Sequence, residues 1–241
     1  MIIYPSFAID PSIQEAGKRA MDRIAPVLAG IDETADYNQQ KMMAAFSAAH
    51  VSESHFAAST GYGYGDRGRE ALDQVYAYAL GAEDALVRHN FVCGTHALTV
   101  ALFGVLRPGD AMLSVTGVPY DTLQGVIGLT GDGNGSLREF GIRYEQVDLK
   151  PDGTPDYEEI ARRVKPGLKM AYLQRSRGYS LRPSLFVEEI GKIAKLVKEK
   201  APDCIVMVDN CYGEFVQREE PLAYGADLMA GSLIKNPGGG V

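Results

Sequence analysis

The sequence contains no long hydrophobic segment. None of its apolar runs approaches the roughly 18 uninterrupted residues that a membrane-spanning helix requires, although 46% of its 241 residues are hydrophobic. The segment Met1 to Asp10 also lacks a basic region followed by an apolar run and a small-residue cleavage site, so no secretory signal is visible. From these two absences we expect a cytoplasmic protein without a membrane partner.

Positive charge and cysteine are both scarce. The formal net charge is -7, and acidic and basic residues are interleaved, which opposes attraction to a phosphate backbone and excludes a nucleic-acid partner. The three cysteines, Cys93, Cys204 and Cys211, are an odd number without C-x-x-C spacing and lie mostly in apolar stretches. This pattern argues against disulfides and against zinc, and we expect no metal site.

Several common catalytic and binding motifs are missing. No G-x-G-x-x-G follows the first predicted strand, which disfavours a dinucleotide enzyme. Ser232-x-x-Lys235 matches the S-x-x-K of penicillin-recognising enzymes, but no S-D-N or K-T-G accompanies it. The acidic segment that begins at Asp132 has Leu137 and Arg143 where a calcium loop needs glycine and glutamate. We therefore interpret that segment as an ordinary loop.

What the sequence does contain is a regular alternation of helical patterns and short apolar runs. The predicted strands are Ala85 to Val87, Ala111 to Val115, Ile142 to Val147, Lys169 to Leu173, Cys204 to Val208 and Asp227 to Gly231. The predicted helices between them are Arg69 to Leu80, Thr95 to Leu106, Thr122 to Leu129, Tyr157 to Val164 and Ser184 to Glu199. This order predicts an α/β fold with a mostly parallel open sheet flanked by helices. Ligands of such sheets gather at the carboxyl ends of the strands.

The N-terminal part precedes this alternation. Two helical patterns, Pro11 to Gly30 and Tyr37 to Ala49, predict a helical arm. The segment Thr60 to Gly68 then alternates glycine with two tyrosines. Such a loop is either a plain connector or a contact surface.

Two predicted strands end in residues that can carry chemistry. Asp209 follows the apolar run Cys204 to Val208, and a charge at that place needs a partner unless it only caps the next turn. Lys235 follows the last predicted strand, with Ser232 just before it and glycines after it. Among apolar and glycine residues a lysine loses hydration, which lowers its pKa and makes it a better nucleophile. Alone, it would more often be an exposed loop residue.

Two further elements complete the set. Gly94, Thr95 and His96 lie where a predicted helix begins, and the free amides and threonine hydroxyl of such a start suit a phosphate group. Tyr120 follows the second strand, where its ring either stacks on a planar ligand or packs at a turn. Together with Asp209 and Lys235, these residues fit one ligand, pyridoxal 5'-phosphate (PLP), which is planar, cationic, phosphorylated and able to form an imine with lysine.

Five motifs in the same order resemble a known family. They are T-G-Y-G-Y-G-D-R-G-R, G-T-H-A-L, L-R-P-G-D-x-x-L-S-V-T-G-x-P-Y-D-T-L, Q-R-S-R-G-Y-S-x-R-P-S and S-L-I-K-N-P-G-G-G. They are similar to the methionine gamma-lyase-like branch, often labelled aluminium resistance protein, of the fold-type I PLP enzymes of Cys/Met metabolism. The resemblance covers nearly the whole chain. It implies an N-terminal arm and inter-subunit loop over residues 1–68 and a PLP-binding large domain over residues 69–241.

The resemblance also implies an activity and the roles of the site residues. Lys235 would form the imine and move protons, and Asp209 would hold the cofactor's ring nitrogen protonated. Tyr120 would stack on the ring, and the phosphate would bind to a second set of residues, Gly94, Thr95, Ser232 and, as a hydrogen-bonding neighbour, His96. The expected reaction is elimination from a sulfur-containing amino acid by a PLP-dependent lyase. Transamination, or PLP binding by a catalytically impaired fragment, is the alternative.

The family further implies a homodimer or homotetramer with shared active sites. A tyrosine and an arginine of the neighbouring subunit would reach the phosphate, and Tyr64 and Arg67 are the nearest matches, with Tyr62 or Arg69 as substitutes. Relatives continue past the lysine into another strand and a small C-terminal domain, so we expect an incomplete large domain. An arginine in Gln174 to Tyr179 is a candidate partner for a substrate carboxylate.

Overall fold

The computed structural model describes residues 8–60, 62 and 64–238. Its helical elements are α1 (Pro11–Ala48), η1 (Glu53–Phe56), α2 (Arg67–Leu80), α3 (Gly94–Val105), α4 (Asp121–Ile127), α5 (Tyr157–Arg163), α6 (Val187–Lys200), η2 (Pro221–Tyr224) and η3 (Ile234–Gly238). The strands are β1 (Ala111–Ser114), β2 (Arg143–Gln146), β3 (Met170–Gln174), β4 (Ile205–Asp209) and β5 (Leu228–Ala230). No described helix is both long enough and apolar enough to cross a membrane.

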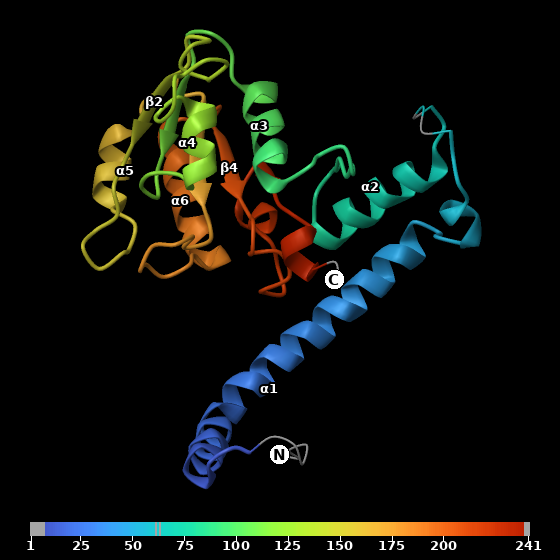
Figure 1. Cartoon of the computed structure of the whole chain (residues 1–241). Helices are drawn as coiled ribbons and strands as arrows, with labels where there is room; N and C mark the ends of the chain where they lie inside the picture. Colours follow the sequence, from blue (N-terminus) through green and yellow to red (C-terminus); the bar gives the residue numbers. More distant parts are fainter. Residues whose placement is uncertain (1–7, 61, 63, 239–241) are drawn as a thin grey trace.

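The strands form one parallel sheet in the order β2-β1-β3-β4-β5. Helices cover both of its faces (Figure 1), which confirms the predicted α/β class. Gln174, Asp209 and Ala230 share one register position, so β3, β4 and β5 end together at the carboxyl edge. Within the described part of the chain, β5 has a strand partner on one side only.

Each face of the sheet has its own core, because side chains alternate between faces along a strand. Ala171, Val206 and Val208 belong to one core, which α5 and α6 cover. Tyr172 and Met207 belong to the other, which α3 and α4 cover. The same alternation directs Asp209, two residues after Met207, to the face that α3 and α4 cover.

Residues 85–87 do not form the predicted strand, and this prediction was wrong. Their backbone is bonded to a side chain of α2 instead: the Val87 amide donates to Asp73 Oδ1 at 2.7 Å. Arg88 Nη1 contacts the same oxygen at 2.7 Å. Leu86 is exposed rather than buried in a sheet. A run of three apolar residues was too short to distinguish a strand from a loop beside a helix.

The two helical patterns of the arm lie in one continuous helix of 38 residues, α1. Gly30 was the predicted end of the first helix, but neither proline nor a second glycine follows it before residue 37. A single glycine weakens a helix by only about 1 kcal/mol relative to alanine, so the helix continues. The division of the chain at residue 68 stays a prediction.

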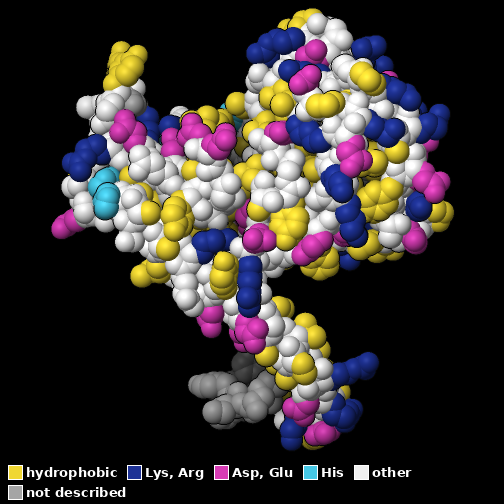
Figure 2. Space-filling model, turned by 180° about the vertical axis from the view of Figure 1, so that it is seen from behind, with side chains coloured by type: hydrophobic (Ala, Val, Ile, Leu, Met, Phe, Trp, Pro, Cys, Tyr) yellow, Lys and Arg dark blue, Asp and Glu magenta, His cyan; other side chains and the backbone are white. Residues whose placement is uncertain are grey.

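Among the described residues, the contacts that anchor helix α1 to the rest of the molecule lie in its C-terminal half. Ala45 packs against Val75 and Ala79 of α2, and Asn38 Nδ2 donates to the carbonyls of Phe215 and Gln217 at 2.9 and 3.0 Å. The N-terminal half projects from the molecule and exposes hydrophobic side chains (Figures 1 and 2). The arm is therefore held by α2 and by the segment that follows β4.

Gly128→Ala should destabilise the fold, because Gly128 ends α4 with φ +91°. A left-handed backbone costs about 1 to 2 kcal/mol in a residue with a Cβ. A Cβ there would also lie 2.5 Å from Ser136 Oγ. We expect urea unfolding to show a loss of at least about 1 to 2 kcal/mol. Gly125→Ala, in the same helix with no atom within 4 Å of a built Cβ, is the control and should not destabilise. Equal losses in both variants would contradict this account.

Candidate functional site

A cleft lies at the carboxyl edge of the sheet, where the segments after β1, β3, β4 and β5 meet the start of α3. It is lined by Thr95, Leu98, Tyr120, Thr122, Leu123, Ser176, Gly178, Asp209, Cys211, Tyr212 and Lys235. Four of the predicted site residues, Thr95, Tyr120, Asp209 and Lys235, are therefore brought together. They come from segments far apart in the sequence, and the parallel sheet joins them.

Asp209 lies at the floor of this cleft and is 3% exposed. Its Oδ2 accepts a hydrogen bond from the Tyr172 hydroxyl at 3.1 Å, and its Oδ1 accepts one from the Cys211 amide at 3.1 Å. Burial raises the pKa of the carboxyl, and these bonds and Lys235 oppose that shift without cancelling it. Among the described residues no cation lies within ion-pair distance of it. The carboxylate thus lacks the cationic partner that its charge requires.

Lys235 follows β5 on η3, and its ammonium group lies between two tyrosine rings. Nζ is 4.6 Å from the ring centre of Tyr212 and 6.0 Å from that of Tyr120. Distances within about 6 Å allow cation–π attraction. The lysine is half-buried. Its amine is therefore held at the cleft among aromatic rings.

The start of α3 meets the turn that carries Ser232. Gly94 is buried and Ser232 is 7% exposed. A Cβ built on Gly94 would lie 3.1 Å from Cys211 Sγ and 3.4 Å from Ser232 Cβ, so a larger residue would require Cys211 to shift slightly. Thr95 Oγ1 is hydrogen-bonded to Thr122 Oγ1 at 2.7 Å, which joins the starts of α3 and α4. First-turn amides and three hydroxyls therefore border one small region, a suitable place for an anion.

Tyr120 is held on the cleft by two neighbouring segments. Its amide donates to Gln174 Oε1 at 2.7 Å, and its ring lies 5.7 Å from that of Tyr179. Gly178 has φ +58°, and a Cβ there would lie 3.4 Å from Tyr120 Cδ2. Hydrogen bonding with Tyr179, followed by burial, raises the pKa of the Tyr120 hydroxyl to about 12. The ring is therefore neutral and fixed beside the lysine.

Five predicted site residues are not among those that line the cleft. Gly94 and Ser232 lie close to each other beside Cys211, which does line it, and the other three are His96, Tyr64 and Arg67. His96 packs edge-on against Phe91 at 5.7 Å and faces the Val92 amide at 3.4 Å. Tyr64 is 88% exposed, and Arg67 is exposed at the start of α2. The described residues of the Gly-rich loop that precede α2, which are 60, 62 and 64–66, lie at the end of this helix that is farther from the sheet (Figure 1). Within one chain these described residues do not reach Lys235.

The predicted arginine candidates differ from one another. Arg175 is buried, and its Nη1 donates to Asn210 Oδ1, to the Gly213 carbonyl and to Glu220 Oε2 at 2.8, 2.8 and 3.2 Å. Burial lowers the pKa of this guanidinium despite the neighbouring carboxylate. Its donors are occupied by the loop that follows β4. Arg177, by contrast, is exposed.

Sequence reasoning missed Tyr212. It adopts φ +68°, which is uncommon for a residue other than glycine, and this backbone brings its ring to Lys235. The turn D-N-C-Y-G signals a change of direction after β4 but does not say which side chain faces the cleft. Cys211, Thr122 and Tyr179 were missed for the same reason, because each lies on a loop or a helix start.

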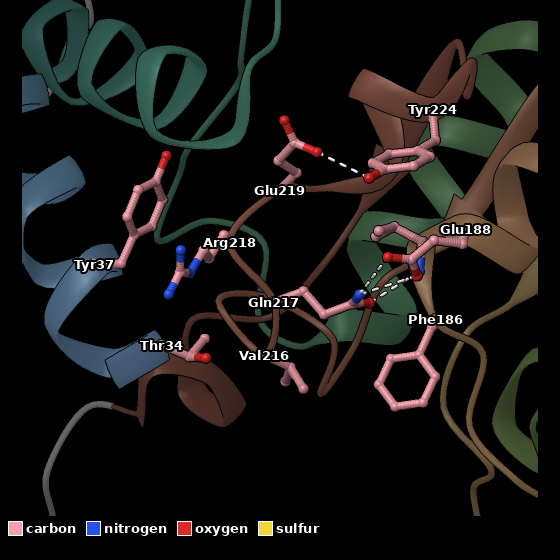
Figure 3. Close-up of a pocket in the computed structure, with 10 residues that line it drawn as sticks. Thr34, Tyr37, Phe186, Glu188, Val216, Gln217, Arg218, Glu219 and Tyr224 are labelled. Atoms are coloured by element: carbon pink, nitrogen blue, oxygen red, sulfur yellow. Dashed lines mark hydrogen bonds between the residues drawn. The ribbon is translucent and has the colours of Figure 1, made fainter. Parts of the chain in front are cut away.

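A second, wider pocket of about 540 Å³ lies apart from this cleft, between α1 and the segments that precede α6 and follow β4. Figure 3 shows Tyr37 and Arg218 on one side and Phe186 and Glu188 on the other. The Arg218 guanidinium lies over the Tyr37 ring at 5.2 Å. None of the predicted site residues lines this pocket.

Asp209→Asn tests the electrostatics of the cleft in protein without added ligand. Because the folded-state pKa of Asp209 is raised, folding favours the protonated carboxyl, and this contribution is lost as the pH rises through the folded pKa. The melting temperature of the variant relative to wild type should therefore increase between about pH 4 and pH 8. Asp203→Asn removes an exposed carboxylate and is the control. If the difference in melting temperature between Asp209→Asn and wild type does not change with pH, the raised pKa of Asp209 would be refuted.

Comparison with known proteins places the chain in a family. Residues 13–241 match the family model described as Methionine gamma-lyase. The chain is 50% identical to the uncharacterized protein YnbB of Bacillus subtilis strain 168 over 219 residues, which cover 90% of this chain and 52% of YnbB. It is 28% identical to cystathionine beta-lyase MetC of the same strain over 187 residues, which cover 76% of this chain and 42% of MetC.

A solved structure agrees with this match. The carbon-sulfur lyase involved in aluminum resistance from Clostridium novyi NT is 49% identical and superposes with a TM-score of 0.89, over 94% of this chain and 54% of that one. The chain thus spans about half the length of YnbB and of the Clostridium novyi lyase. Because the family model matches nearly the whole chain from residue 13 to residue 241, the chain belongs to the methionine gamma-lyase family.

Proposed function

We propose that this chain forms the cofactor-binding part of a PLP-dependent carbon–sulfur lyase that acts on a sulfur-containing amino acid. One observation carries the proposal: a buried carboxylate without a cationic partner, Asp209, lies in the same cleft as a half-buried lysine, Lys235. A ligand with a cationic ring nitrogen and a group that reacts with amines meets both requirements at once.

The residues present fit PLP on several independent points. Ser232, Thr95 and the first amides of α3 border a region suited to its phosphate. Tyr120 provides an aromatic face at the cleft. Asp209 is buried enough for its charge to act strongly on a ring nitrogen, since interactions strengthen when water is excluded. His96 remains a neighbour of the phosphate region, and its packing on Phe91 favours a structural role.

Each residue then has a defined task. When bound, PLP withdraws electrons from the substrate's α-carbon and so stabilises the charge that develops there. Asp209 would keep the ring nitrogen protonated, and Tyr120 would hold the ring in place. Lys235 would bind the cofactor covalently and, once displaced by the substrate amine, would move a proton at the substrate carbon through Nζ. Its half-buried position between Tyr120 and Tyr212 suits both tasks.

Family membership and two named relatives support the proposed substrate class. Family membership points to methionine gamma-lyase-like chemistry. The Clostridium novyi relative is named a carbon-sulfur lyase and MetC a cystathionine beta-lyase. Both names refer to cleavage of a carbon–sulfur bond. We therefore favour elimination from a sulfur amino acid over transamination.

Lys235→Ala should abolish both covalent PLP binding and turnover. Borohydride reduction of the wild-type protein with PLP, followed by peptide mapping, should find the pyridoxyl group on Lys235. Incubation with L-cystathionine and with L-methionine, each assayed for α-keto acid and thiol, should show release by the wild type only. The ratio of the two rates distinguishes the substrates.

Lys198→Ala is the matched control, because Lys198 caps the Cys204 carbonyl and pairs with Asp227 away from the cleft. It should retain the pyridoxyl label on Lys235. A label on another lysine in the wild type would refute the role of Lys235. Wild-type protein that binds PLP on Lys235 but releases neither α-keto acid nor thiol would instead support the impaired-fragment alternative, and release of α-keto acid without thiol would support transamination.

We also propose that the protein works as a homodimer or homotetramer. The projecting half of α1 exposes six large hydrophobic side chains, Ile13, Met21, Ile24, Val27, Leu28 and Ile31. Ile24, Val27 and Ile31 are spaced by three and four residues, so they lie on one face of the helix. Such an apolar face is a typical contact surface. The exposed Tyr64 and Arg67 would then reach a neighbouring subunit's cleft.

Ile24→Glu should shift the protein toward the monomer, because it places a charge within this apolar face. Light scattering should give a multiple of the 26.1 kDa chain mass for the wild type and a smaller value for the variant. Ala29→Glu adds the same charge to an exposed position on roughly the opposite side of the helix and should leave the mass unchanged. A monomeric wild type that binds PLP tightly would contradict the proposal.

A further inference from the structure

Two loops of the cleft are tied together by side chains that have no role in the scheme above. Glu214 lies in the loop after β4, and its Oε1 accepts a hydrogen bond from the Ser232 amide at 2.6 Å. Asn236 lies in the loop after β5, and its Nδ2 donates to the carbonyls of Glu214 and Tyr212 at 2.9 and 3.3 Å. Each loop thus sends a side chain to the backbone of the other.

The surroundings of Glu214 are closely packed. Glu214 is 1% exposed, and a Cβ on Gly231 would overlap Glu214 Oε1, so a larger residue beside Ser232 would displace this carboxylate. On either side of Glu214, Tyr212 and Phe215 adopt φ values of +68° and +61°. Backbone of this kind persists when the surrounding contacts hold it in place.

We propose that Glu214 and Asn236 are positioning residues that form a latch between the two loops, and that this latch holds Ser232 and Lys235 in place against α3 and Asp209. The inference rests on the proposed function, in which Ser232 meets the phosphate and Lys235 the aldehyde. Neither latch residue touches the reacting atoms. Their effect is exerted through the backbone of residues 232–236.

The turn that carries the lysine explains how the latch acts. Lys235 and Asn236 both donate backbone hydrogen bonds to the Ser232 carbonyl, at 2.9 and 3.1 Å. Residues 232–236 therefore form one compact turn. Glu214 fixes its first residue through the amide, and Asn236 fixes its last through the side chain. Misplacement of a site by about 1 Å is enough to impair binding and catalysis.

The charge of Glu214 adds a measurable signature. Burial, together with Glu220 and Asp209, raises the pKa of its carboxyl to about 7. Tyr76 from α2, Cys211 and Arg175 also interact with this carboxyl electrostatically. Within the described part of the chain Oε2 has no hydrogen-bond partner. Because the folded-state pKa is raised, the contribution of Glu214 to stability is lost as the pH rises toward 7.

Three variants and one control test the latch in the full chain. Glu214→Ala and Asn236→Ala each remove one side of it, whereas Glu214→Gln keeps an oxygen that accepts the Ser232 amide but cannot ionise. Glu219→Gln alters an exposed carboxylate of the same loop, which bonds Tyr224. The readouts are hydrogen exchange at the Ser232 amide without PLP, the Kd for PLP from its visible absorbance, and the melting temperature against pH.

For Glu214→Ala we expect Ser232 amide exchange and the Kd for PLP each to rise about tenfold or more, the effect of losing one buried hydrogen bond. Asn236→Ala should raise the same Kd in the same direction. Glu214→Gln should stay within about threefold of wild type in both, while the fall in melting temperature between about pH 5 and pH 8 becomes smaller. Glu219→Gln should match wild type throughout.

The outcomes separate the latch from the proposed function. Wild-type protein that does not bind PLP would refute the proposed function, and Ser232 exchange would still test the latch. Wild-type protein that binds PLP, with Ser232 exchange and Kd unchanged in Glu214→Ala, would overturn the latch. If Glu214→Ala fails to fold, the Kd of Asn236→Ala for PLP and the pH dependence of the melting temperature of Glu214→Gln decide the question. Wild-type values in both variants would also overturn the proposal.

Discussion

The burial of one carboxylate, Asp209, is the constraint on which the site depends. It ends a central strand whose neighbours are apolar, and the period of the strand directs its side chain to the face that α3 and α4 cover. Tyr172, itself fully buried, and the Cys211 amide stabilise the charge only in part, since the pKa of the carboxyl remains raised. A buried ionisable group held in this way is typical of a functional site and atypical of a core that only has to be stable. The lysine, the helix start and the tyrosine ring can be interpreted as parts of a ligand site because they lie beside this carboxylate.

Pocket volume alone would have indicated a functional site beside α1 rather than at the carboxyl edge of the sheet. The pocket of about 540 Å³ beside α1 is much wider than the cleft, yet its polar groups pair with one another: Gln217 with Glu188, and Tyr224 with Glu219 (Figure 3). It lies where α1 passes the segments that precede α6 and follow β4, with the Arg218 guanidinium over the Tyr37 ring. In the cleft, by contrast, a carboxylate, an amine and the start of a helix converge, and among the described residues the carboxylate has no cation within ion-pair distance. Converging polar groups around a buried charge without an ion-pair partner therefore indicate a functional site better than the volume of a pocket does.

The parts of the fold that the sequence predicted are those governed by periodicity. Strands β1 to β5 and helices α2 to α6 lie where apolar spacing indicated. Asp209 and Lys235 could be predicted to lie together because ligands of parallel sheets gather at the carboxyl ends of the strands.

The wrong predictions concern places where local interactions decide the structure. In residues 85–87 the Val87 amide donates to the Asp73 carboxylate instead of to a strand, and α1 continues past Gly30. Tyr212 reaches Lys235 only through a left-handed backbone, and nothing in a turn sequence reports which side chain such a conformation directs to the cleft. The partners of buried polar groups, such as Glu214, depend on distances across loops that no periodicity encodes.

The segment of residues 210–220 connects these observations physically. Glu214 binds the turn that carries Ser232, Asn210 and Glu220 bind Arg175 after β3, and the carbonyls of residues 215, 217 and 218 accept hydrogen bonds from Asn38 and Lys41 of α1. One loop therefore supports the arm on its outer side and the lysine turn on its inner side. Its buried polar groups are largely hydrogen-bonded, and such a network makes a segment rigid. The contacts with α1 and the contact with the turn of Ser232 and Lys235 therefore meet in one loop, which connects the arm physically to the candidate cleft.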